Sequence, residues 1–107
     1  MKLLIRAEAE AEVVKITGTL GQARIGYGQR FLEALAKAYE SIQTYPVSYP
    51  RWEFGGRGRH LRRAVLKKFH IVVVFEVRES VEEVEVFAVF HARRNPRYWM
   101  RRLKPVE

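Results

Sequence analysis

Residues 69–77, with the sequence FHIVVVFEV, decide the fold of this chain. Seven of these nine residues are β-branched or aromatic, and side chains of both kinds favour strands. A nearly unbroken apolar run is typical of a strand that is buried on both faces of its sheet. We therefore predict a central strand over residues 69–77, which needs strands at its edges and covering layers on its faces.

Three shorter runs supply the neighbouring strands. Residues 61–66 and residues 84–91 predict one strand before and one strand after the central strand in the sequence. The charged segment 78–82 is short enough to form a hairpin turn into the last strand. Residues 2–6 predict a further short strand near the N-terminus. Together these runs predict a small sheet.

Two helices are predicted between the first strand and the others. The first begins near Glu8, because acidic side chains are favourable at the positive end of a helix dipole. Its apolar residues recur at helical spacing: Val13, Ile16 and Leu20. The second helix covers residues 29–45, after a glycine-containing turn at residues 26–28. Its apolar face repeats at steps of three or four residues: Phe31, Leu35, Tyr39 and Ile42.

A short helix is predicted near the C-terminus. Asn95 is a typical N-cap residue, Pro96 suits the first helical position, and Pro105 ends the helix. The order of elements predicts one α+β domain over residues 1–107, with two helices packed on one face of an antiparallel sheet. We expect the other face of the sheet to be free to form a cleft.

Composition narrows the class of protein. The 107 residues include no cysteine, which excludes disulfides and thiolate metal sites and fits a reducing compartment. The longest strongly apolar run, residues 71–75, is far too short to span a membrane. The first six residues contain only three consecutive apolar side chains, too few for the core of a signal peptide. We expect a cytoplasmic protein that needs no cofactor.

Positive charge is clustered along the chain. Residues 51–75 hold seven cations against one acid, and residues 93–107 hold six against one. Residues 76–92, in contrast, hold five acids against one cation, and the whole chain has a net charge of +8. Solubility alone does not require such clustering, so we predict a surface that binds a polyanion or an acidic partner.

Residues 90–102, with the sequence FHARRNPRYWMRR, carry the candidate catalytic groups. Cleavage of RNA needs a base for the ribose 2′-OH, cations for the charge that develops on phosphate, and a proton donor for the leaving oxygen. His91 is the candidate base, because the charges of Arg93 and Arg94 favour its neutral form. Tyr98 is the candidate donor, or a ring on which a base stacks. We predict His91, Arg93 and Tyr98 as catalytic residues.

Other cations are predicted to bind the substrate or its phosphates. Guanidinium and ammonium groups pair with phosphate oxygens. The predicted set is Arg62, Arg63, Lys67, Arg94 and Arg101. Only one of Arg62 and Arg63 can face a given side of the sheet, because successive strand residues alternate.

Structural roles compete with these assignments. A histidine that ends an apolar strand often caps the next loop, which gives His91 an alternative role. Tyr98 and Trp99 diverge by about 100° on a helix. We assign Trp99 to the core, because Leu103 lies four residues later on the same face, and we expect Tyr98 to point outward.

The remaining histidines are not assigned to a site. His60 lies in a basic loop, and His70 lies where the predicted central strand enters the core. Three scattered histidines in a chain without aspartate make a metal site an unfavoured hypothesis.

Six segments of the chain resemble RelE/ParE-family toxins. They are residues 9–12, 26–32, 42–46, 62–69, 71–77 and 86–96. The resemblance implies the toxin of a type II toxin–antitoxin (plasmid stabilisation) module, with a compact α+β fold, neutralised in a hetero-oligomer by a small antitoxin. Arg93 and Arg94 then have an alternative role as partners of acidic antitoxin side chains. The chain departs from many relatives at Thr19-Leu20, where they carry Trp-Tyr, and at residues 69–71, where they often carry Phe-Pro-Tyr.

The resemblance leaves the activity open. RelE-like members cleave mRNA on the ribosome, whereas ParE-like members poison DNA gyrase without known catalysis of their own. We favour RNA cleavage, because residues 90–102 supply the necessary groups. A gyrase poison would use its cations as contacts and Tyr49, Trp52 and Phe54 as interface anchors, although these aromatics also suit a cover for one end of the core. A nucleic-acid-binding module without toxicity is a third hypothesis, and it predicts binding that falls steeply with salt.

Overall fold

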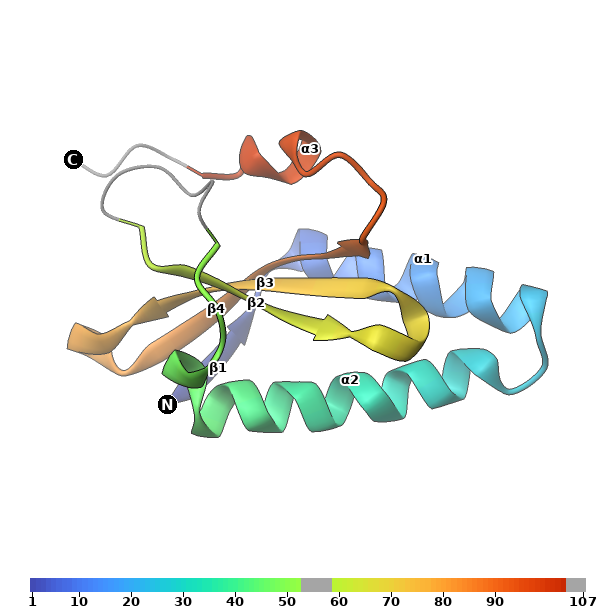
Figure 1. The fold of residues 1–107 in the computed structure, drawn as a ribbon, viewed down its shortest axis with the longest axis horizontal. Coiled ribbons are helices and arrows are strands. Elements are labelled where there is room, and N and C mark those ends of the chain that lie inside the picture. The colour runs from blue at the N-terminus through green and yellow to red at the C-terminus, as the bar shows by residue number, and fades with distance from the viewer. Residues whose placement is uncertain (53–58, 104–107) are drawn as a thin grey trace.

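A computed structural model describes residues 1–52 and 59–103 (Figure 1). The helices are α1 (Ala7–Ala23), α2 (Tyr27–Thr44) and α3 (Arg97–Met100). The strands are β1 (Lys2–Ile5), β2 (Leu61–Leu66), β3 (Ile71–Arg78) and β4 (Glu83–His91). Short 3-10 turns lie at Pro46–Ser48, Lys67–Phe69 and Glu79–Val81. The predicted order of helices and strands is therefore confirmed.

The four strands form one sheet in the order β1-β4-β3-β2. β3 pairs antiparallel with both β2 and β4, and its residues 71–77 are all buried. β1 pairs parallel with β4, so that Ile5 lies opposite Val86. This arrangement follows from the long connection through α1 and α2, because parallel strands need a crossover rather than a tight turn. The predicted α+β class is confirmed, with one parallel pairing among the described strands.

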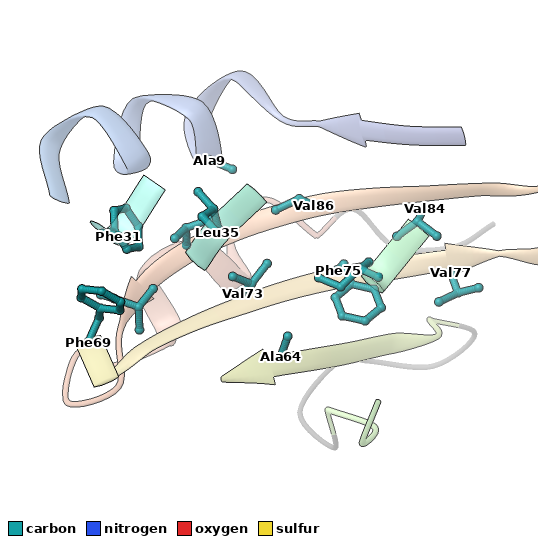
Figure 2. Close-up of a cluster of buried hydrophobic side chains, with 13 residues drawn as sticks. Ala9, Phe31, Leu35, Ala64, Phe69, Val73, Phe75, Val77, Val84 and Val86 are labelled. Carbon is teal, nitrogen blue, oxygen red and sulfur yellow. The ribbon is translucent and has the colours of Figure 1, made fainter. Parts of the chain in front are cut away.

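Each face of the sheet has its own apolar core. α1 and α2 cover one face, where Phe31 and Leu35 pack against Val73, Phe75 and Val86 (Figure 2). The other face is covered by the C-terminal segment through a second cluster: Leu61, Val72, Val74, Phe87, Ala88, Phe90 and Trp99. The expectation of an open cleft on this face is therefore wrong, because α3 lies across it (Figure 1). The prediction that Trp99 belongs to the core is confirmed, since its side chain is fully buried.

β3 begins two residues later than predicted. Phe69 belongs to the turn Lys67–Phe69, and His70 ends that turn with φ of 55°. The Phe69 ring turns back onto the helical layer, with its centroid 5.0 Å from that of Tyr27 and 5.7 Å from that of Phe31. Because the left-handed conformation is incompatible with a strand, His70 lies exposed outside β3 rather than at the entry to a buried strand.

The start of α3 also differs slightly from the prediction. Pro96 is the residue that precedes the helix, and Asn95 lies one position earlier. The Asn95 side-chain oxygen still accepts a hydrogen bond of 3.0 Å from the backbone N–H of Arg97. The predicted helix stop at Pro105 lies outside the described residues.

A β-bulge interrupts the pairing of β4. Val74 lies opposite Ala88 while Phe75 lies opposite Val86, so that Phe87 is an extra residue. Phe87 and Ala88 consequently both face the second core, which strict alternation would forbid. The pairing of β1 ends at Val86, so beyond the bulge β4 is an edge strand on that side.

Gly28 allows α1 and α2 to approach closely. It is buried in the first turn of α2, and a Cβ at this position would lie 2.7 Å from the backbone oxygen of Thr17. Real side chains essentially never show so short a contact, and the Thr17 backbone is fixed within α1. The crossing of the two helices therefore depends on glycine at position 28.

We expect Gly28→Ala to lower the free energy of unfolding by about 1–3 kcal/mol, because the helix pair must separate to admit the methyl group. Gly18→Ala is the matched control, since apart from its chain neighbours and its own helix backbone no heavy atom would lie within 4 Å of its Cβ. Alanine is the better helix former, so Gly18→Ala should raise stability by about 0.5–1 kcal/mol. Urea denaturation followed by circular dichroism measures both. Equal effects of the two substitutions would contradict the close approach at Gly28.

Candidate functional site

Three turns come together at one end of the molecule. The β2–β3 turn and the end of β4 are tied by a 2.7 Å hydrogen bond from the backbone N–H of Ala92 to the carbonyl of His70. The α1–α2 turn joins them, because the Tyr27 hydroxyl donates to the carbonyl of Lys68 at 3.3 Å. Figure 1 shows these segments on the right of the view. The fold thus collects segments that are far apart in the sequence.

This end of the molecule is strongly positive, and we call it the cationic end. It consists of exposed residues from all three turns: Arg24, Arg30, Lys67, Lys68, His70, His91, Arg93 and Arg94. The β3–β4 turn, at the opposite end of the sheet, carries the acidic residues Glu79, Glu82 and Glu83. The charge clusters of the sequence therefore become two poles of the molecule, and the positive pole suits a polyanion.

His91 is the last residue of β4 and is exposed. Its Nδ1 accepts a hydrogen bond of 3.1 Å from the backbone N–H of Arg93. Since this nitrogen supplies the lone pair, the neutral ring carries its proton on Nε2. His91 therefore closes the loop, as the structural alternative predicted, and also presents an N–H donor to solvent. This tautomer favours a role as donor over the predicted role as base.

His70 is the neighbour that the sequence did not suggest. Its ring centroid lies 6.1 Å from that of His91, with 41° between the ring planes. The two imidazoles meet because Ile71, the first residue of β3, pairs with His91. The sequence offered only one indication, a single histidine between Phe69 and the apolar run. A histidine at this position is equally compatible with the start of a strand.

A groove of about 220 Å³ opens beside His91, between α1 and the ends of β3 and β4. Its floor is apolar: Ile16, Leu20, Phe69, Ile71, Val89 and Phe90. Lys15, His91 and Arg94 also line it and supply positive charge or a donor, and Glu12 and Thr19 complete the lining. The groove thus combines an apolar floor with cations, a combination that suits a nucleotide base and its phosphate.

Tyr98 does not point outward. Its hydroxyl donates a hydrogen bond to Oε2 of Glu12 in α1. Arg94 lies over the Tyr98 ring, with its guanidinium carbon 3.4 Å from the ring centroid. Burial, and then the hydrogen bond to Glu12, raise the pKa of Tyr98 well above its ordinary value. The phenol proton is therefore held within the protein, whereas Arg94 keeps an exposed charge above it.

Glu12 also binds Arg102 and the edge of β4. Its Oε1 accepts from the Arg102 guanidinium at 3.0 Å and from the backbone N–H of Val89 at 3.1 Å. Arg102 in turn donates to the carbonyl of Phe87 at 2.8 Å. The pairing of β1 ends at Val86 and leaves these backbone groups of β4 without a strand partner, and the ion pair satisfies them. Neither Glu12 nor Arg102 was predicted to have this role.

The other predicted phosphate ligands are spread over the molecule. Lys67 lies at the cationic end, because it follows β2 directly. Arg62 and Arg63 lie opposite Phe75 and Val74, several residues along β3 from that end. Their side chains are also engaged: Arg62 donates to the carbonyl of Tyr49 at 2.7 Å, and Arg63 lies over the ring of Trp52 at 5.9 Å. Arg101 is exposed just after α3. The structure thus places Lys67 with His91, Arg93 and Arg94, and the other three elsewhere.

Tyr49 and Trp52 cover the core. Tyr49 stacks edge-on against Phe75 at 5.6 Å, and Trp52 lies 5.6 Å from Trp99. Both side chains are partly buried, which agrees with the covering role suggested for these aromatics. Phe54 lies outside the described residues.

Within residues 1–52 and 59–103, no three histidine, aspartate or glutamate side chains lie close enough together to hold a metal ion. None of the helices in the described part of the chain is long and apolar enough to cross a membrane.

Comparison with known proteins identifies the family. Residues 3–96 match the sequence model described as the ParE toxin of the type II toxin–antitoxin system parDE. No curated protein matches the chain significantly. The matched range runs from the second residue of β1 to the residue before α3, and therefore covers α1, α2, nearly the whole sheet and the cationic end. The chain belongs to the ParE toxin family of type II toxin–antitoxin systems.

Proposed function

We propose that this toxin cleaves RNA on the ribosome, in the cytoplasm, at its cationic end. The observation that carries the proposal is the position of His91. Its exposed imidazole ends β4 beside the exposed Arg93 and Arg94, and it lines the apolar groove. A hydrogen-bond donor, phosphate ligands and a surface for a base are thus adjacent.

The groups at this end match the needs of RNA cleavage. A base that stacks on the apolar floor of the groove places its phosphate near Arg94 and Lys15. Arg93 and Lys67, both exposed, supply further positive charge for the phosphate. Because Tyr98 is bonded to Glu12, its proposed contribution is to hold Arg94 through ring stacking rather than to give up a proton. Arg62, Arg63 and Arg101 are proposed to contact RNA farther from the cut.

The family implies a cognate antitoxin as a partner. We propose that this antitoxin is acidic where it meets the cationic end, and that it forms a hetero-oligomer with the toxin. An acidic segment would pair with the exposed cations of this end.

Gyrase poisoning is the second candidate, and the family match favours it. The matched sequence model is that of ParE, and the resemblance implies that ParE-like toxins poison DNA gyrase. In this case the cations would be contact residues on gyrase.

Induction of the toxin without antitoxin separates the two activities. We expect new 5′ ends in a translated reporter transcript within minutes, mapped by primer extension, and no increase in gyrase-linked DNA breaks. A reporter that lacks a ribosome-binding site is the control and should remain intact. DNA breaks without transcript cleavage would overturn the proposal in favour of gyrase poisoning. Steeply salt-dependent RNA binding with neither cleavage nor growth arrest would support a nucleic-acid-binding module without toxicity.

A further inference from the structure

We propose that His70 is the general base of the RNA-cleavage reaction, with His91 as the hydrogen-bond donor opposite it. The inference rests on the proposed function, because it assigns roles within the same site. It starts from the meeting of two exposed imidazoles, 6.1 Å apart between ring centroids, at the positive pole of the molecule.

The hydrogen bonds of the two rings differ and set their roles. Nδ1 of His91 accepts the backbone N–H of Arg93, so that the neutral ring offers Nε2–H as a donor. The ring of His70 makes no hydrogen bond within residues 1–52 and 59–103, whereas its backbone carbonyl accepts from Ala92. His70 is therefore held by its backbone and keeps a nitrogen lone pair available to a substrate.

The backbone of His70 lies in the left-handed region, with φ of 55° and ψ of 38°. Histidine is among the residues that adopt this region more often than most, and Glu82 adopts it at the end of the β3–β4 turn. This conformation turns the chain into β3, so that His70 lies exposed just outside the strand.

The spacing of the rings suits one phosphodiester group. Each imidazole reaches an oxygen at about 2.8 Å, so rings 6.1 Å apart can contact two oxygens of the same linkage. The surrounding cations Lys67, Lys68 and Arg93 are exposed and free to attract the phosphate.

The proposed step is a transesterification. The neutral His70 ring takes the proton of the ribose 2′-OH while the 2′ oxygen forms a bond to phosphorus. The bond between phosphorus and the 5′ oxygen breaks, and the 5′ oxygen takes a proton from water. Nε2–H of His91 donates to a non-bridging phosphate oxygen as charge develops there. The products are a 2′,3′-cyclic phosphate and a 5′-hydroxyl, and His70 then loses its proton to solvent.

Two substitutions with opposite outcomes test the assignment. His70→Gly removes the imidazole and is compatible with the positive φ, so the fold should be retained. We expect cleavage of a reporter mRNA in a reconstituted translation reaction to fall about 10²–10⁴-fold, and added imidazole to restore part of it. His91→Gln keeps an N–H donor near the position of Nε2. Its cleavage rate should therefore stay within about tenfold of the parent rate, since tenfold is about the effect of losing one hydrogen bond.

The outcomes distinguish this inference from the proposed function. Wild-type toxin that leaves the reporter intact would overturn RNA cleavage and the role of His70 together. Wild-type cleavage with an unimpaired His70→Gly variant would overturn only the role of His70. His70→Asn, which also tolerates positive φ, is a second variant and should fail in the same way as His70→Gly. A loss in His70→Gly that imidazole does not rescue, with an unchanged melting temperature, would also overturn the assignment.

Discussion

Trp99→Ala is expected to lower the free energy of unfolding by about 3–5 kcal/mol, the usual cost of truncating a fully buried aromatic residue. The Trp99 side chain has no exposed surface, and its ring lies 5.6 Å from that of Trp52 and 6.1 Å from that of Phe90. Alanine would leave a cavity that α3, only four residues long, cannot close. Because small domains are stable by about 5–15 kcal/mol, this loss is a large part of the total.

Urea denaturation followed by far-ultraviolet circular dichroism measures the effect. Arg97→Ala is the matched control on the same helix, since Arg97 is exposed and should change stability by less than about 0.5 kcal/mol. The two cores share β3 and β4, so the transition should remain a single cooperative step in both variants. A loss below about 1 kcal/mol for Trp99→Ala would show that α3 is not needed to cover the sheet.

The elements of this fold are predictable because each has a local signature. The apolar face of α2 and the β-branched run of β3 can each be recognised from a short stretch of consecutive residues. The assignment of Trp99 to the core also needed only Leu103, four residues away. The ends of the elements were predicted less accurately, as the two-residue shift at the start of β3 shows. An apolar residue such as Phe69 suits a strand and a buried turn equally well.

The arrangement of the site depends on pairing that no local pattern records. Glu12 meets Val89, Tyr98 and Arg102 across separations of 77, 86 and 90 residues. In the sequence, Glu12 is one of three similar glutamates that suit the start of a helix. The bulge at Phe87 cannot be recognised from the sequence either, because one extra apolar residue does not interrupt an apolar run. The Glu12 contacts therefore became visible only in the folded structure.

The Glu12 contacts also explain how the C-terminal segment is held on both sides of β4. Trp99 packs on one face of the sheet, while Arg102 reaches the β4 edge and Glu12 on the opposite helical layer. The segment between them carries Tyr98, whose ring supports Arg94. A loss of the Glu12 carboxylate should thus affect stability and the cationic end together.

Glu12→Ala is expected to lower the free energy of unfolding by about 2–4 kcal/mol. Breaking a fully buried pair costs about 3–5 kcal/mol, and the Arg102 and Glu12 side chains keep 15% and 13% of their surface exposed, which reduces the cost. The substitution leaves Arg102, the Tyr98 hydroxyl and the Val89 N–H without their shared acceptor.

The matched control Glu40→Ala should lose little stability, because Glu40 is an exposed glutamate of α2. A double-mutant cycle with Tyr98→Phe isolates the shared hydrogen bond, and we expect a coupling free energy of about 0.5–3 kcal/mol, as for other residues in direct contact. Additive effects of the two substitutions would contradict a direct bond between Glu12 and Tyr98.

Cleavage of the translated reporter by Tyr98→Phe should persist, because the phenol proton is donated to Glu12 rather than to the substrate. Loss of cleavage in Tyr98→Phe at unchanged stability would instead return Tyr98 to the role of proton donor.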